Sequence, residues 1–440
     1  MNAAAGIALV LAALGVLIGG VKMLQMRGAV GAETARKMVH IGMGIICLQF
    51  PVIFSEAWPV WILAGLAVIA LGALRFVPSL KCGAGTVLHD VNRSSFGEVY
   101  FPLGVAAVFA FAKGDALKFY IPVSLLTFAD AAGALVGKRW GLHTYPTLEG
   151  RKSIEGSVAV GFTALLCAMV PLLAMGHDLI VCIVIGALVG LFGMIVEAVS
   201  WRGLDNVFLP LAALAQVTIY LKLPLPELAL RLPVLLGIST LAWCWRRSRV
   251  ADECARLGGA LALYFFWTVG GWTWLVAPLV LLVSYMWLMP APPDGDPPHT
   301  MMAMICISSV GLVWAVAQTF LPSPEWLWWF TLGIATHHAV IATARYSQRR
   351  SHWSRLKWWA VGTLQAVFVQ GAAFVLIDHA HVASAVDIAV GFVCTALAVA
   401  TFVCCERNLP MPADLTLRWW KQGATALVAS LAGGGIVHLL

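Results

Sequence analysis

Charged residues are scarce in this sequence of 440 residues: Asp, Glu, Lys and Arg make up 11%, whereas 61% of the residues are hydrophobic. The mean hydropathy is correspondingly high, at +0.88. A soluble globular domain carries about 25% charged residues, so the composition excludes one and predicts a membrane protein. The alternating segments of roughly ten residues that a β-barrel needs are absent. We therefore expect an all-α fold, a polytopic transmembrane helical bundle.

Several familiar signals are also missing. The ten cysteines form no CxxC pair, which disfavours zinc ligation and a disulfide framework. No GxxxxGK[ST] motif follows a predicted strand, which excludes the nucleotide fold of soluble P-loop kinases. No basic residue precedes the first apolar stretch, so we expect a retained helix rather than a cleaved signal peptide. The lack of an organelle-targeting segment favours a bacterial inner membrane.

Apolar stretches near 20 residues long predict about 16 membrane spans. They lie at 3–23, 38–54, 57–74, 97–112, 119–136, 157–175, 179–199, 205–221, 228–244, 257–270, 271–289, 301–320, 325–343, 358–377, 383–403 and 423–440.

The net charge of +7 does not indicate a nucleic-acid partner, because the cations cluster beside the predicted spans. If the N-terminus lies outside, 24 of the 28 Lys and Arg residues fall in cytoplasmic loops, as the positive-inside rule requires. The exceptions are Lys113, Lys118, Lys222 and Arg231. We therefore predict that the N-terminus is outside and that the polar loops described below face the cytoplasm, where nucleotides are found.

Asp130 lies inside an apolar stretch, where a carboxylate costs roughly 2.5–3.5 kcal/mol and a functional role is the default hypothesis. Ala129, Gly133, Gly137 and Gly141 recur at every fourth position around it, a pattern that lets another helix or a ligand approach the backbone closely. The loop that follows, 137–156, combines cations, hydroxyls and glycines, a composition suited to binding phosphate.

Three further segments place polar residues at the edges of spans. Arg36 and His40 share one helix face, either as an interfacial basic flank or as part of a phosphate site. Glu98 begins a span, where the helix dipole alone can favour a carboxylate. Asp205, which follows Glu197 across a short turn, can be a helix N-cap or a site residue. Together Asp130, Glu155 and Asp205 would suffice to hold Mg²⁺, which prefers oxygen ligands.

Five pieces of the first half, in this order, resemble the dolichol kinase/phytol kinase branch of the membrane CTP-transferase superfamily. They are RKMVH at 36–40, FGEVYFPLG at 96–104, DAAGALVGK at 130–138, GRKSIEGS at 150–157, and the segment from Glu197 through RGLDN to Pro210. The resemblance covers about residues 20–222. It implies transfer of the γ-phosphoryl group of a nucleoside triphosphate, usually CTP with Mg²⁺, to an isoprenoid alcohol such as phytol, farnesol, geranylgeraniol or dolichol.

The resemblance also implies roles for individual residues. Asp130, Lys152 and Glu155 would be catalytic, and Asp130 would act as a metal ligand or as the base that accepts the hydroxyl proton. Asp130, Glu155 and Asp205 would hold the metal, with support from Glu98 and Glu197. Nucleotide-binding residues would be Arg36, Lys37, His40, Gly133, Gly137, Lys138, Arg151, Ser153, Gly156, Ser157, Arg202 and Asn206.

Two other functions compete with this interpretation. Phosphatidate cytidylyltransferases share the helix of Asp and small residues, but their long terminal signature is here reduced to the segment 197–210. A transporter would explain many spans and a buried Asp, yet it predicts internal repeats, whereas the polar motifs lie in one half. We therefore predict a lipid-alcohol kinase domain at 1–224 and a further multi-span domain at 225–440 whose function the sequence does not indicate. The expected partners are the lipid alcohol, the nucleotide and membrane lipids, and a homo-oligomer is compatible with them.

Overall fold

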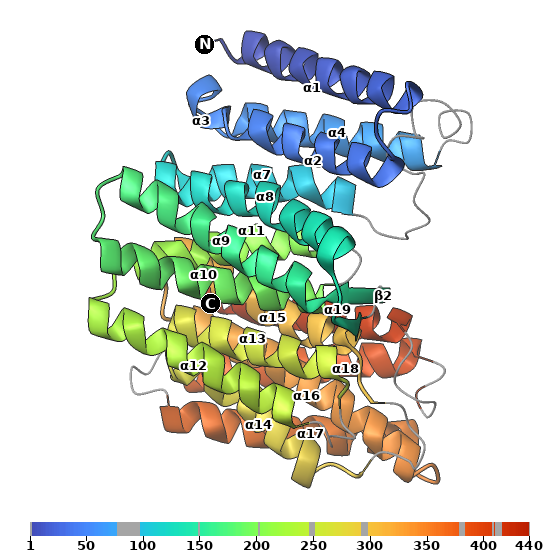
Figure 1. The fold of residues 1–440 in the computed structure, drawn as a ribbon. Helices are drawn as coiled ribbons and strands as arrows, with labels where there is room; N and C mark the ends of the chain where they lie inside the picture. Colours follow the sequence, from blue (N-terminus) through green and yellow to red (C-terminus); the bar gives the residue numbers. More distant parts are fainter. Residues whose placement is uncertain are drawn as a thin grey trace. The chain divides into compact units, whose positions relative to one another are not determined.

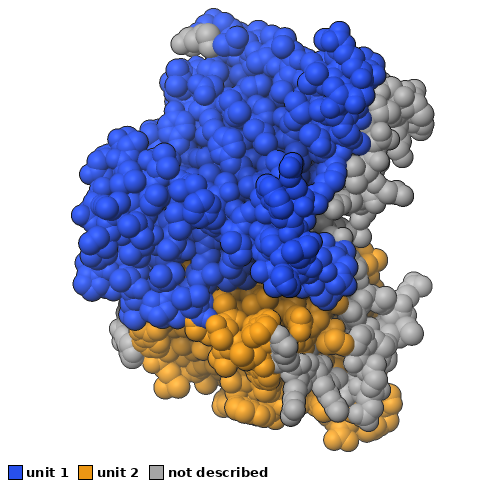
Figure 2. Space-filling view, viewed as in Figure 1, with its two compact units in different colours: residues 1–236 blue, residues 237–440 orange. Residues whose placement is uncertain are grey.

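The computed structural model describes residues 2–76, 97–147, 150–200, 203–245, 251–291, 298–377, 383–406, 409 and 416–439. The chain is divided into two compact units, Met1–Leu236 and Gly237–Leu440 (Figure 2). The division falls inside the helix that begins at Leu225. The predicted functional boundary at 224/225 stays a prediction.

The first unit is a helical bundle with one small hairpin (Figure 1). Its elements are α1 (Ala3–Met26), α2 (Ala32–Cys47), α3 (Phe50–Ile53), α4 (Trp58–Phe76), α7 (Gly97–Ala112), α8 (Ala116–Trp140), β1 (Thr144–Thr147), β2 (Gly150–Ser153), α9 (Ile154–Ala174), α10 (Leu179–Val199), α11 (Asp205–Tyr220) and α12 (Leu225–Cys244), the last of which runs across the division.

The second unit is also helical in its described part. Its helices are α13 (Glu253–Gly270), α14 (Thr273–Trp287), α15 (Met301–Phe320), α16 (Trp326–Arg349), α17 (Arg355–Ile377), α18 (Ala385–Cys405) and α19 (Thr416–Leu439). Each of the sixteen predicted spans thus overlaps a helix of the described chain, and the span at 38–54 overlaps both α2 and α3. Among the described residues, nine helices are long and apolar enough to cross a membrane. The predicted all-α polytopic fold is confirmed.

Helix α9 shows how this apolar sequence divides its surface between protein and lipid. Small and branched side chains at every fourth position, among them Val160, Ala164 and Ala168, are buried against α8 and α10. The opposite face exposes large apolar groups such as Val158 and Phe162, which are 56% and 61% exposed. An outer face of this kind suits a hydrocarbon environment, because lipid tails offer it apolar contacts.

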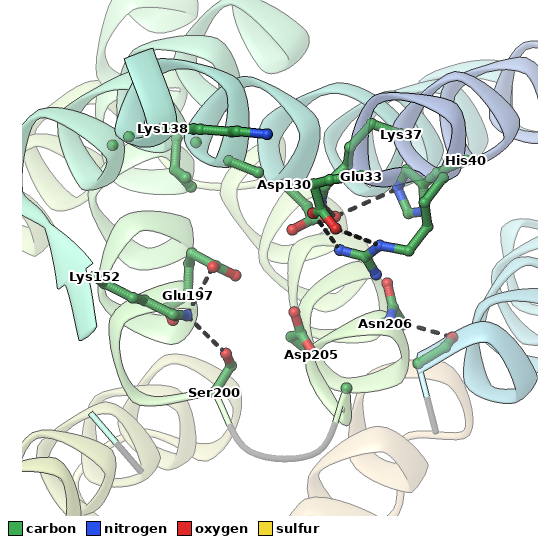
Figure 3. A pocket seen from close by; sticks show the side chains of 18 of the residues that line it. Glu33, Lys37, His40, Asp130, Lys138, Lys152, Glu197, Ser200, Asp205 and Asn206 are labelled. Carbon is green, nitrogen blue, oxygen red and sulfur yellow. Dashed lines mark hydrogen bonds and ion pairs between the residues drawn. The ribbon is translucent and has the colours of Figure 1, made fainter. Parts of the chain in front are cut away.

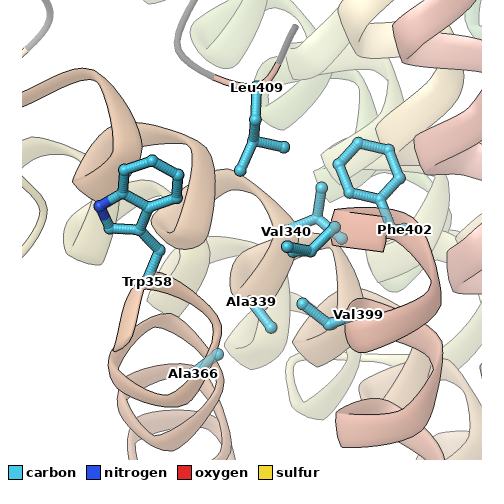
Figure 4. Packing of buried hydrophobic residues seen from close by; sticks show 8 residues of the cluster. Ala339, Val340, Trp358, Ala366, Val399, Phe402 and Leu409 are labelled. Atoms are coloured by element: carbon cyan, nitrogen blue, oxygen red, sulfur yellow. The ribbon is translucent and has the colours of Figure 1, made fainter. Parts of the chain in front are cut away.

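In the second unit, α16 is the central helix and packs against α14, α15, α17, α18 and α19. Figure 4 shows part of the surrounding core, where Val340 of α16 lies near Phe402 of α18 and Leu409. The helix also buries His337 and His338, whose Nδ1 atoms lie 3.4 Å from Gln422 Nε2 and 3.5 Å from Gln370 Nε2. Polar side chains therefore join the central helix to α19 and α17.

Candidate active site

A cavity of about 530 Å³ lies within the first unit, lined by α2, α7, α8, the hairpin, α9, α10 and the start of α11 (Figure 3). All of the predicted site residues that the structure describes line it except Glu155. Those that do are Arg36, Lys37, His40, Glu98, Asp130, Gly133, Gly137, Lys138, Arg151, Lys152, Ser153, Gly156, Ser157, Glu197, Asp205 and Asn206. Segments as far apart as residues 36 and 206 thus meet in one pocket.

Asp130 is paired with a buried lysine on another helix. The Nζ of Lys37 lies 2.5 Å from Oδ2 of Asp130, and the Lys37 side chain is only 4% exposed whereas Asp130 remains 29% exposed. His40, one turn further along α2, places Nε2 at 3.8 Å from the same oxygen and 3.1 Å from the carbonyl oxygen of Leu126. The carboxylate therefore lies at the cavity wall with a cation on one side and open space on the other.

Helix α2 carries a second ion pair on the face that lines the cavity. The Nη2 of Arg36 lies 2.9 Å from Oε1 of Glu33, three residues earlier on the helix. Both side chains are about one quarter exposed, so the pair is accessible from the cavity. An arginine that is held in place and partly hydrated is well suited to bind phosphate oxygens.

The hairpin carries Lys152 into the cavity. Strand β2 pairs antiparallel with β1, with Tyr145 opposite Lys152, and its first residue Gly150 has a φ of +126° that few other residues adopt. The Lys152 ammonium donates to the Glu197 carboxylate at 2.7 Å and to Ser200 Oγ at 3.0 Å, and it also contacts the Glu197 carbonyl. Three oxygens of α10 and its C-terminus thus orient this cation.

Electrostatics keep Lys152 charged. Burial opposes the charged form most strongly, but the nearby carboxylates of Glu197 and Asp205 outweigh burial, and the net effect raises the pKa of Lys152. A cation that stays protonated in a partly buried position is a stable partner for a polyphosphate.

Glycines allow α8 and α9 to approach closely beside the cavity. A Cβ at Gly133 would collide with the side chain of Val160, and one at Gly156 would lie 2.9 Å from the carbonyl oxygen of Gly133. The Ser153 hydroxyl accepts from the Gly156 amide at 3.1 Å and caps α9. The close approach predicted from the four-residue spacing of small residues is therefore present in the structure, and it brings the start of α9 against the middle of α8.

The start of α11 closes the cavity from a further side. Asn206 donates from Nδ2 to the carbonyl oxygen of Gly97 at 3.2 Å, which joins α11 to the start of α7. Asp205, the first residue of α11, and Glu98, the second residue of α7, both line the cavity. In Figure 3, Asp205 lies between the Lys152–Glu197 pair and Asn206.

Glu155 is not brought together with the other acidic residues. Its Oε1 lies 2.7 Å from His143 Nδ1, and the His143 amide also donates to the carboxylate. Glu155 therefore ties the start of α9 to the segment before β1. Arg202 lies outside the described residues.

The cavity carries balanced charge. Its lining holds five cationic side chains, Arg36, Lys37, Lys138, Arg151 and Lys152, and five carboxylates, Glu33, Glu98, Asp130, Glu197 and Asp205. Among the described residues, no three His, Cys, Asp or Glu side chains are close enough to form a metal site by themselves. The donors are nevertheless of the type that Mg²⁺ prefers, because it is usually held by one or two carboxylates plus phosphate oxygens and water. Asp130 and Asp205 fit that requirement.

Ten residues of the cavity lining are ones that the sequence did not indicate as site residues. They are Glu33, Val39, Met43, Gly97, Phe101, Ala134, Thr144, Val160, Ser200 and Gly203. Glu33 and Met43 follow the helical spacing of Arg36 and His40, so the periodicity of α2 was a signal for both. Ser200 lies three residues after Glu197, so its closeness in sequence to a predicted site residue was a comparable signal. Val160 and Thr144 had none, because only tertiary packing brings them to the cavity.

Comparison with known proteins gives one informative match. The chain is 32% identical over 203 residues to a phytol kinase of Synechocystis sp. (strain ATCC 27184 / PCC 6803 / Kazusa), and the match covers 46% of this chain and 84% of that protein. No protein-family model matches the chain. No solved structure matches it.

Proposed function

The chain belongs, through its N-terminal half, to the phytol kinase family, and we propose that it transfers the γ-phosphoryl group of a nucleoside triphosphate to an isoprenoid alcohol in the membrane. The observation that carries this proposal is the meeting of Asp130 with Lys37, Arg36 and Lys152 around one cavity in an apolar helical unit. Phosphoryl transfer depends mainly on positioning and on neutralising charge, and this cavity has groups suited to both.

The triphosphate would be bound by the cations that line the cavity. Lys152 is oriented by Glu197 and Ser200, while Arg36 is positioned by Glu33 on the face of α2. Lys138 and Arg151 line the same cavity from α8 and the hairpin. The Arg151 guanidinium donates to Thr144 Oγ1 at 2.6 Å, which holds its side chain along the hairpin. Cations from several different elements would surround the phosphates in this arrangement.

Asp130 and Asp205 would hold Mg²⁺ together with the phosphate oxygens. The metal ion supplies neutralisation of the charge that develops on the transferred group. We assign Asp130 to the metal rather than to a base, because phosphoryl transfer makes little demand on a strong base and a carboxylate beside a lysine is a better anionic ligand. We leave Glu155 out of the metal site, since it contacts His143 and does not line the cavity.

The finer features of the function are further parts of the proposal. CTP is the proposed donor, as the family resemblance implies, and phytol, farnesol, geranylgeraniol and dolichol are candidate acceptors. The mouth of the cavity would face the cytoplasm of a bacterial inner membrane, because the excess of Lys and Arg lies in the loops on that side. The unit Gly237–Leu440 has no proposed reaction.

The position of the transferred label tests this proposal. Purified full-length protein in mixed micelles would be given Mg²⁺, an isoprenoid alcohol and CTP or ATP labelled at either the α or the γ phosphorus. The proposal expects a labelled lipid monophosphate from the γ-labelled nucleotide alone. Label that reaches a phospholipid only from the α position would show nucleotidyl transfer instead, and transfer from neither position would rule out both reactions.

A further inference from the structure

Helix α2 presents a continuous stripe of side chains to the cavity. Glu33, Arg36, Lys37, His40 and Met43 all line it, at spacings of three and four residues that place them on one face. With a rise of 1.5 Å per residue, the stripe from Arg36 to Met43 spans about 10 Å. Its polarity changes from charged to apolar over that distance, so the two ends of the cavity favour different chemical groups.

Apolar side chains from other helices accompany Met43. Phe101 of α7 is 3% exposed, and Val160 of α9 is 2% exposed, yet both line the cavity. The Phe101 ring packs edge-to-face on the His40 ring, with centroids 5.0 Å apart. Since His40 Nε2 lies 3.8 Å from Asp130 Oδ2, the His40 ring stands between the Phe101 ring and the carboxylate.

The size of the cavity limits what it can enclose. A volume of about 530 Å³ falls within the usual range for one small-molecule site, roughly 300–1,000 Å³. A nucleotide would take up most of it, which leaves room only for the first part of a long alcohol. The rest of the chain would have to lie outside the cavity, in the bilayer.

We propose that Val39, Met43, Phe101 and Val160 form the subsite for the hydroxyl-bearing end of the acceptor. The protein would then recognise the structure of this end of the alcohol and not the length of its chain. The proposal rests on the kinase function proposed above. The first isoprene unit, with its methyl branch, would pack on Met43 and Phe101 and direct the hydroxyl toward Asp130. A flexible thioether at position 43 can adapt to such a branched group.

The test compares two tryptophan substitutions on the same helix. Met43→Trp adds bulk inside the cavity, whereas Ile45→Trp adds the same group to the exposed apolar face two residues away. Initial rates would be measured in mixed micelles over a series of surface mole fractions of farnesol, geranylgeraniol, phytol and unbranched hexadecan-1-ol. Met43→Trp should raise the KM for the branched alcohols about tenfold or more, the cost of overpacking a filled site. The nucleotide KM should be unchanged, and Ile45→Trp should change neither.

Met43→Ala provides a second variant in case the tryptophan disturbs folding. A larger subsite should reduce the preference for branched over unbranched alcohol by several-fold. In the wild-type protein, the KM should be similar for farnesol and geranylgeraniol, which share the same head. A KM that follows chain length, or a Met43→Trp protein with normal acceptor KM, would overturn the subsite while leaving the kinase function intact. Failure of the wild-type protein to phosphorylate any alcohol would overturn both.

Discussion

The Nζ of Lys37 lies 2.5 Å from the Oδ2 of Asp130, although 93 positions separate the two residues in the sequence. Their ion pair joins α2 to α8 at the wall of the cavity. Lys37 is almost fully buried, so loss of its partner would leave a charge shielded from water without its paired carboxylate. The pair therefore contributes to the stability of the site as well as to its electrostatics.

Substitution of Lys152 should weaken nucleotide binding specifically. Loss of a charge-assisted contact costs about 1.5–3 kcal/mol, so Lys152→Met should raise the nucleotide KM roughly 10–100-fold, and Lys152→Arg should recover part of the loss. The acceptor KM should stay the same. Lys118→Met is a matched control, because Lys118 pairs with Asp115 at the start of α8, outside the cavity lining. An equal effect of both methionine variants would contradict the role given to Lys152.

The assignment of the metal ligands predicts different behaviour for two carboxylates. Asp205→Asn should raise the Mg²⁺ concentration for half-maximal activity at least about tenfold. Even the loss of a residue that only hydrogen-bonds to a metal ligand typically lowers metal affinity about 10–100-fold. Glu155→Gln should change it by less than about twofold, because an exposed contact with His143 contributes little. A Mg²⁺ titration of initial rates measures both. A larger shift in Glu155→Gln than in Asp205→Asn would contradict the assignment.

Close packing of α8 against α9 can be tested by thermal unfolding in detergent. Gly133→Ala forces a Cβ into Val160, and overpacking of this kind costs about 1–3 kcal/mol. The unfolding midpoint should therefore fall. Gly19→Ala in α1 adds a Cβ where no atom lies within 4 Å, and replacing a helical glycine there gains about 0.5–1 kcal/mol. Similar shifts of the unfolding midpoint in both variants would show that α8 and α9 are not closely packed at Gly133.

His299 should make the stability of the second unit depend on pH. Burial, with a smaller contribution from the nearby Arg345 and Arg418, lowers the pKa of His299 to about 4. The unfolded chain, with a histidine pKa near 6.5, takes up a proton before the folded chain does. Stability should thus be unaffected by His299 above about pH 6.5 and should fall as the pH drops toward 4.

Comparison of the wild-type protein with His299→Gln isolates this effect. The variant keeps a side chain that can hydrogen-bond to the Tyr285 hydroxyl, which lies 2.7 Å from His299 Nε2. Unfolding midpoints measured from pH 7 to pH 4 should fall less steeply for His299→Gln. Parallel curves would mean that His299 does not titrate differently in the folded and unfolded states.

The sequence predicted the helices and most cavity residues because both have local signals. Apolar runs near 20 residues mark the spans, and short polar motifs at their ends mark the cavity. The partners of these residues had no local signal: nothing in the sequence pairs Lys152 with Glu197 or Lys37 with Asp130, since such contacts depend on how helices pack.

The direction of the Glu155 side chain could not be predicted from its neighbours in the sequence. It follows Lys152 by only three residues and was predicted to share its site. The chain changes from strand to helix at Ser153, however, and this turn directs Glu155 to His143 while Lys152 points to the cavity. The hairpin itself, with four-residue strands between two apolar helices, was not predicted.

One pair of variants decides whether Asp130 serves phosphoryl transfer in this cavity. Transfer of the γ-label to phytol would be measured for Asp130→Asn and for Asp178→Asn in the full-length protein. Asp178 caps α10 away from the cavity, and asparagine caps a helix equally well, so this control should keep wild-type activity. The rate of γ-label transfer should fall at least about 100-fold in Asp130→Asn, because the variant loses a group that stabilises charge in the transition state. A wild-type rate of transfer by Asp130→Asn would show that the Asp130 carboxylate is not needed for phosphoryl transfer.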